Sequence, residues 1–168
     1  MLTARPQRGV SLLEVLVALA IFNIGALGIS GWMLLAARTT HAAYLRTQAS
    51  LFAGDMVERM YANPAGVQIG AYDGEAKAGV STCDARTPCQ PAALAAHDRA
   101  VWAARLQAVL PDGSGAIYCE HALTTEPPAK PGPFGGLCTL SLRWLERGAG
   151  DEHHRAASPR SLAWVFQP

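Results

Sequence analysis

The chain has 168 residues, of which 50% are hydrophobic, and its 14 Lys and Arg nearly balance its 13 Asp and Glu. This length accommodates one domain of ordinary size together with a membrane segment. Because nucleic-acid-binding domains concentrate positive charge, the balanced composition argues against that class, and we expect no nucleic acid among the partners.

The first feature along the chain is a long apolar segment that contains one charge. From Val10 to Ala37 the only charged residue is Glu14, and the run from Val15 to Ala37 exceeds the roughly 20 residues that span a bilayer core. An ionised carboxylate costs about 3 kcal/mol at mid-membrane, so a membrane acid normally has a partner. The run holds no Lys or Arg, so the partner must come from elsewhere.

A short basic leader with Arg5 and Arg8 precedes the apolar segment. Together with the small-residue triplet Ala18-Leu19-Ala20, it allows the alternative of an ordinary secretory signal peptide. Cleavage at that triplet would leave a short apolar region with Glu14 in its middle and a second apolar stretch after the cut. We therefore favour cleavage before the apolar run.

Cleavage between Gly9 and Val10 would create the missing cation. The new α-amino group on Val10 lies four residues ahead of Glu14, and residues at this spacing share a helix face. Glu14 could then meet its own amine or the amine of a neighbouring subunit. In the second case the buried charge would set the register between subunits, as buried polar groups do in helical bundles.

At Gly9 and Glu14 the chain resembles the type IV prepilin family. The resemblance implies that prepilin peptidase removes residues 1–9, that the new amine of Val10 is methylated, and that Glu14 acts in assembly. Val10 departs from the Phe that is usual in major pilins. Pseudopilins of type II secretion share the motif, so this resemblance indicates a superfamily and not one machine.

Three glycines, Gly25, Gly28 and Gly31, lie within the apolar segment. Each costs about 1 kcal/mol of helix propensity relative to Ala, so we expect a soft helix there. Close packing of small residues against neighbouring helices would account for them. The resemblance to pilins implies a second role, extension of this segment in a filament, although major pilins often have Pro at the position of Gly31.

Beyond Ala37 the pattern becomes amphipathic. Apolar residues recur at steps of three and four, as in a helix with one buried stripe: Leu45, Ala49, Phe52, Met56 and Met60. We predict one helix from Ser11 to Ala62, ended by Asn63-Pro64. The predicted organisation is a leader (1–9), a transmembrane or filament-core half (10–37), an amphipathic half (38–63) and a globular domain (64–168).

The segment from Glu58 to Val67, which contains Asn63-Pro64, resembles the end of the long helix in minor type IV pilins of the PilV group. Gly70-Ala71-Tyr72, the four cysteines and the aromatic C-terminal strands fit the same group. This resemblance implies other minor pilins, the major pilin and prepilin peptidase as partners.

The second half of the chain predicts an α+β domain. We expect a loop over Gln68–Gln90, a helix over Pro91–Leu110 and strands over Ala116–Leu123 and Leu137–Leu145. A last strand has Leu162, Trp164 and Phe166 on one face. These faces need a common cover, and the amphipathic half of the long helix provides one. The predicted fold is a long helix packed on a small antiparallel sheet with one additional helix.

All four cysteines lie after the apolar segment: Cys83, Cys89, Cys119 and Cys138. An even number in a small exported domain indicates disulfides. Three pairings are possible, and we favour Cys83 with Cys89 and Cys119 with Cys138. Zinc is the rival, but the gap between Cys83 and Cys89 exceeds the usual ligand spacing. The C-x-x-C motif of a redox pair is absent.

Nothing in the sequence predicts a catalytic residue, a metal or a cofactor. His153-His154 beside Asp151-Glu152 could ligate a metal, but a solvated loop between Gly148 and Pro159 explains the same residues. The sequence contains no G-x-S-x-G, H-E-x-x-H or phosphate-binding glycine motif.

The membrane orientation depends on more than charge. Arg5 and Arg8 before the span are matched by Arg38 and Arg46 beyond it, so the positive-inside rule hardly decides. The cysteines, and the access that the family's peptidase requires at Gly9, favour a single-pass inner-membrane protein with a periplasmic domain, destined for the pilus (fimbrium).

We therefore expect a minor pilin that takes part in pilus assembly, and no enzyme. A type II secretion pseudopilin is the nearest alternative. A single-span anchored binding or enzyme domain, which never polymerises, is the alternative from another class.

Overall fold

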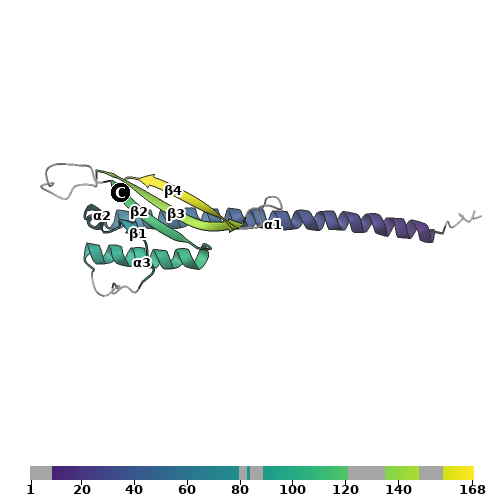
Figure 1. Cartoon of the computed structure of the whole chain (residues 1–168), viewed down its shortest axis with the longest axis horizontal. Coiled ribbons are helices and arrows are strands. Elements are labelled where there is room, and N and C mark those ends of the chain that lie inside the picture. Colours follow the sequence, from purple (N-terminus) through teal and green to yellow (C-terminus); the bar gives the residue numbers. More distant parts are fainter. Residues whose placement is uncertain (1–8, 80–82, 84–88, 121–134, 148–156) are drawn as a thin grey trace, which may run out of the picture.

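A computed structural model describes residues 9–79, 83, 89–120, 135–147 and 157–168. Its dominant element is helix α1 (Leu12–Ala62), which is 51 residues long, about 77 Å at 1.5 Å per residue. One half of α1 lies against the globular domain and the other half projects away from it (Figure 1). The predicted helix is confirmed, except that Ser11 is an extended N-cap before its first residue.

The end of α1 and the segment after it contain more structure than the sequence predicts. Asn63 closes α1, and its side-chain oxygen accepts a hydrogen bond from the Gly66 N–H at 3.2 Å, which starts the short helix α2 (Pro64–Gln68). Strand β1 (Gly74–Glu75) follows. The prediction of a loop over Gln68–Gln90 is therefore wrong at β1 and at Gln68, the last residue of α2. Gly74 has φ of 98°, a conformation that glycine adopts without a Cβ penalty.

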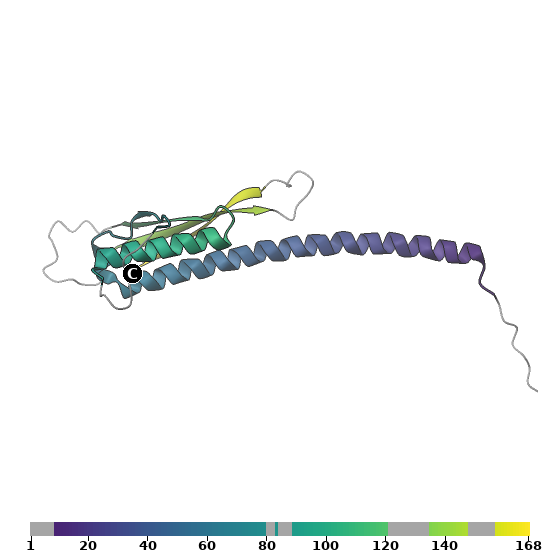
Figure 2. The same cartoon turned by 90° about the horizontal axis from the view of Figure 1, so that it is seen from below.

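Helix α3 (Pro91–Val109) runs beside the C-terminal half of α1 (Figure 2). It ends one residue before the predicted boundary because Leu110 has extended backbone angles. The indole Nε1 of the fully buried Trp102 donates a hydrogen bond to the carbonyl oxygen of Phe52, at 2.8 Å. This bond joins α3 to α1 through a residue whose ring also fills the core.

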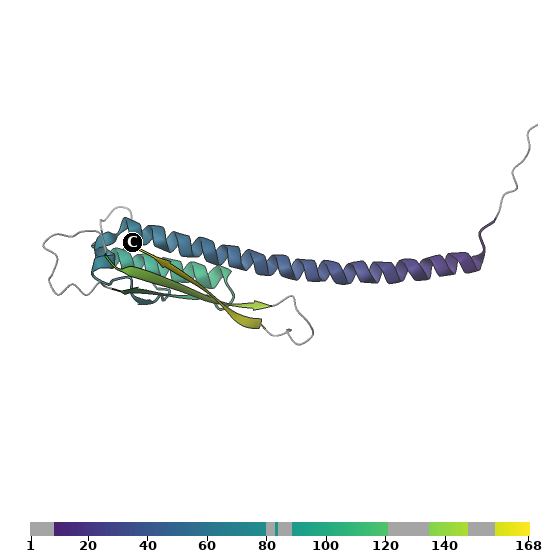
Figure 3. The same ribbon diagram turned by 90° about the horizontal axis from the view of Figure 1, so that it is seen from above.

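The sheet is antiparallel throughout, with strand order β1-β2-β3-β4. Its longer strands are β2 (Ser114–Glu120), β3 (Leu137–Arg147) and β4 (Ala157–Phe166), stacked over α1 and α3 (Figure 3). The strand predicted from Ala116 in fact begins at Ser114, and its predicted last residues, 121–123, lie outside the described residues. The strand predicted over Leu137–Leu145 continues to Arg147.

The core lies between one face of the sheet and the two long helices. The stripe predicted on α1 is buried, as are the alternate residues of β3 that face it: Cys138, Leu140, Leu142 and Trp144. This arrangement confirms the predicted α+β fold. On β4, Leu162, Trp164 and Phe166 pair with Leu142, Leu140 and Cys138, yet only Phe166 is buried, because β4 is the edge strand.

Candidate functional site

The N-terminal half of α1 is an apolar surface without cover. No residue from Gly9 to His41 is buried, and large side chains such as Leu16, Phe22 and Trp32 are more than half exposed. In the described part of the chain, α1 is the one helix long and apolar enough to cross a membrane. An apolar surface of this extent requires a lipid or protein environment.

Glu14 lies exposed in the first turn of this helix. Its backbone N–H donates to the carbonyl oxygen of Ser11 at 3.1 Å. A carboxylate in the first turn interacts favourably with the helix dipole. Among the described residues no ion pair involves Glu14. The carboxylate thus lies at the helix surface, unpaired with any cation in the part of the chain that the structure describes.

The predicted cleavage site lies just before the helix. Gly9 and Val10 are exposed and have no regular secondary structure, and Ser11 is extended with φ −75° and ψ 144°. Val10 therefore does not occupy the helical position four residues before Glu14. The helical spacing that would bring Glu14 to its own amine is absent here, whereas the exposed backbone at Gly9 is accessible to a peptidase.

The structure joins the four cysteines as Cys83–Cys89 and Cys119–Cys138, the pairing favoured from the sequence. Cys119 and Cys138 are register partners on β2 and β3, so their bond crosslinks two neighbouring strands. With both pairs oxidised, the chain has no free cysteine.

A buried carboxylate that the sequence analysis did not single out lies where the sheet meets the middle of α1. The side chain of Glu146 is 2% exposed and accepts two hydrogen bonds from Arg46, at 2.6 and 3.1 Å. The hydrogen bond and charge of Arg46 lower the pKa of Glu146 against the opposing effect of burial, and the charge of Arg160 lowers it further. The same pair raises the pKa of Arg46. The sequence pattern indicates that Glu146 faces inward, because Glu146 is the next residue after Trp144 in the alternation of β3.

A second polar cluster joins the end of α1 to α3. The Tyr72 hydroxyl donates to Asp98 Oδ2 at 2.7 Å and accepts from Asn63 Nδ2 at 3.2 Å. Arg59 Nη1 donates to Asp98 Oδ1 at 2.9 Å, and Arg59 Nε donates to Asp55 at 3.1 Å. Burial and the hydrogen bond to Asp98 raise the pKa of Tyr72, so its hydroxyl stays protonated. These groups satisfy one another and fix the helices in place.

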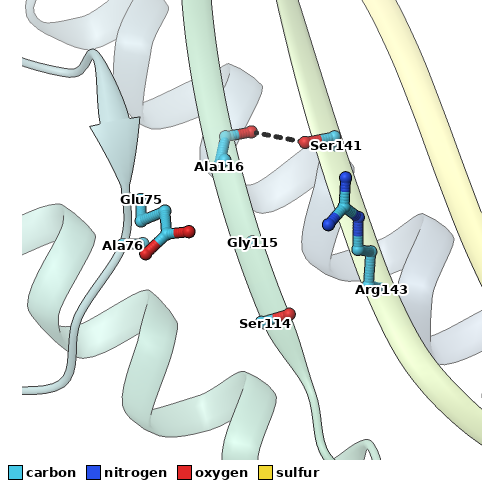
Figure 4. A pocket seen from close by; sticks show the side chains of 7 residues that line it. All are labelled: Glu75, Ala76, Ser114, Gly115, Ala116, Ser141 and Arg143. Atoms are coloured by element: carbon cyan, nitrogen blue, oxygen red, sulfur yellow. Dashed lines mark hydrogen bonds between the residues drawn. The ribbon is translucent and has the colours of Figure 1, made fainter.

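A shallow pocket of about 180 Å³ lies on the sheet between β1 and β3 (Figure 4). Its charged side chains are Glu75 and Arg143, and the Ser141 hydroxyl donates to the carbonyl oxygen of Ala116 at 3.3 Å. No histidine or cysteine lines this pocket. The described residues contain no group of three His, Cys, Asp or Glu that could hold a metal ion. His153-His154 and Asp151-Glu152 lie outside them.

Comparison with known proteins gives one match. A family model described as the prokaryotic N-terminal methylation motif matches residues 4–30. The match covers Gly9, Val10 and Glu14, together with the first part of α1. No curated protein and no solved structure matches the chain.

Proposed function

We propose that this chain, whose N-terminal methylation motif supports a type IV pilin-family protein, is a minor pilin that takes part in pilus assembly. In this proposal prepilin peptidase cuts after Gly9, and the amine of Val10 is methylated. The protein is first held in the inner membrane by α1, with its disulfide-bonded domain in the periplasm. It then joins other minor pilins and the major pilin in the complex that initiates the filament or forms its tip. Its role is structural.

The proposal depends on one observation. From Leu12 to residue 30 the matched motif lies on the N-terminal half of α1, where no residue is buried and Glu14 has no ion pair with any residue that the structure describes. Because Val10 precedes the helix, the partner we assign to Glu14 is the N-terminal amine of a neighbouring subunit. That contact would neutralise both charges and set the axial register of two packed helices. The exposed apolar residues would supply the rest of the helix-helix interface.

The N-terminus is the first test. Mass spectrometry of protein extracted from membranes should show a chain that starts at methylated Val10. An intact Gly9 in the mature protein would overturn the proposal and favour a single-span anchored domain that does not polymerise.

Assembly is the second test. Glu14→Ala should leave cleavage largely intact and strongly reduce piliation in a strain that lacks the wild-type chain. Ser11→Ala is the matched control, because the Ser11 side chain makes no capping hydrogen bond. Normal piliation with Glu14→Ala would refute the role given to this carboxylate. Copurification with secretion components, and not with pilus subunits, would identify a type II secretion pseudopilin.

A further inference from the structure

A pocket of about 320 Å³ lies between α1 and the β3–β4 end of the sheet. We call it the neck pocket, because it lies where α1 leaves the globular domain. It is lined by Arg46, Ser50, Trp144, Arg160, Ser161 and Leu162. The projecting half of α1 begins beside it (Figure 1).

The neck pocket has more positive than negative charge. Two guanidinium groups, from Arg46 and Arg160, share the buried carboxylate of Glu146. Arg46 donates hydrogen bonds to both oxygens of that carboxylate, at 2.6 and 3.1 Å. Arg160 Nε lies 3.7 Å from Oε1, which is beyond hydrogen-bond length. Among the described residues Arg160 has no other ion pair, so its donors remain available.

Two of the six residues that line the pocket, Trp144 and Leu162, are apolar. Trp144 is buried, Leu162 is half-buried, and Trp164 lies two residues further along the same face of β4 with 41% of its surface exposed. A carboxylate held by Arg160 in this setting would be partly desolvated, which strengthens its attraction to the guanidinium. The pocket therefore suits an acidic side chain that has apolar neighbours.

We propose that the neck pocket binds an Asp or Glu carboxylate of a neighbouring protein subunit, with Arg160 as its main donor. The inference rests on the proposed function, since it requires an adjacent subunit. Lipid phosphate has the same charge, but position argues against it. Arg46 lies about 13 Å beyond Ala37 along the helix, whereas the headgroup layer is only about 5–8 Å thick on each side.

The test uses the full chain in cells that make the other pilus subunits. A photoreactive amino acid replaces Ser50, which is exposed on α1 and lines the pocket. Mass spectrometry should identify a crosslinked peptide from a pilus subunit that contains Asp or Glu. We expect Arg160→Gln to reduce its yield about tenfold and Arg160→Lys to retain most of it.

Three comparisons decide the outcome. Arg143→Gln is the matched control, because Arg143 is an exposed arginine on the opposite face of the same strand pair, and the crosslink should survive it. Changing the identified carboxylate to its amide should give the same loss as Arg160→Gln, and the two changes together should not be additive. A crosslink to lipid, or a yield independent of Arg160, would overturn the proposal.

A further variant distinguishes a carboxylate of this chain from one of a neighbouring subunit. The paired change Asp151→Asn and Glu152→Gln should leave the crosslink unaltered, and a loss equal to that of Arg160→Gln would assign the pocket to this chain's own carboxylates. Suppose that the mature chain starts at Val10 and that Glu14→Ala blocks piliation, but that the crosslink yield does not depend on Arg160. This result would refute the neck-pocket inference and leave the proposed function intact. An unprocessed N-terminus would instead remove the proposed function.

Discussion

Arg46 on α1 and Glu146 on β3 form an ion pair with two hydrogen bonds between residues 100 positions apart in the sequence. The arginine side chain is 58% exposed and the glutamate side chain is 2% exposed. The pair therefore places a carboxylate inside the domain and its counter-charge at the surface. It links the end of the sheet to α1, next to the N-terminal half of the helix, which the domain does not cover.

We predict that Glu146→Gln destabilises the domain in a pH-dependent manner. The folded state lowers the pKa of Glu146 through Arg46, so the ionised carboxylate stabilises folding at pH values above the ordinary pKa of a glutamate. That stabilisation is lost as the pH falls through the lowered pKa. At neutral pH the variant should lose about 1–2 kcal/mol of unfolding free energy, and this deficit should shrink in acid.

Denaturant unfolding of the detergent-solubilised chain at neutral and acidic pH measures this deficit. Glu120→Gln is the control, because Glu120 lies exposed on the neighbouring strand β2. A deficit of equal size at both pH values would show that packing, and not charge, accounts for the effect of Glu146.

Tyr72→Phe should weaken the attachment of α1 to α3. The change removes the hydroxyl that donates to Asp98 Oδ2 and accepts from Asn63 Nδ2, while Asp98 stays buried. Leaving buried polar groups without a partner costs about 1–3 kcal/mol. The thermal midpoint should fall accordingly, whereas Tyr118→Phe, at a ring 66% exposed, should leave it unchanged. Equal midpoints for the two variants would contradict this account.

Gly115→Ala should also destabilise the domain. A Cβ at Gly115 would overlap the indole ring of Trp102 and lie 3.1 Å from Leu106 Cδ1. Overpacking of this kind costs about 1–3 kcal/mol. A Cβ at Gly54 within α1 meets nothing within 4 Å, so Gly54→Ala should be neutral or stabilising. Denaturant midpoints of the two variants should therefore move apart, and a shared shift would count against close packing at Gly115.

The sequence predicts those parts of the fold that local patterns determine. The stripe through Leu45 and Met56 repeats at helical spacing, Asn63-Pro64 stops the helix, and alternation from Cys138 to Trp144 marks a half-buried strand. Each signal depends on neighbours in the chain. The α+β class follows once these apolar faces cover one another.

Features that depend on distant residues were not predictable in the same way. Strand β1 has two residues and exists because it pairs with β2, so no periodicity marks it. Glu146 continues the inward alternation of β3 by one step, but its partner Arg46 comes from another element. The sequence predicts a helix that starts at Ser11, but the extended conformation of Ser11 ahead of the first helical residue, Leu12, is visible only in the backbone.

The two disulfides should differ in how much they stabilise the domain. Replacing both Cys119 and Cys138 by Ala should cost more than replacing both Cys83 and Cys89, because the first pair closes a longer stretch of chain, with a sequence separation of 19 against 6. Loop-closure entropy gives losses of about 3 and about 2 kcal/mol. The first pair also crosslinks two paired strands, and Cys119 and Cys138 are both buried in the core, so cavities add to its loss. Denaturant unfolding of the two double variants, with the oxidised wild type as reference, measures the order. A greater loss from the Cys83–Cys89 pair would mean that this bond stabilises more structure than its short loop indicates.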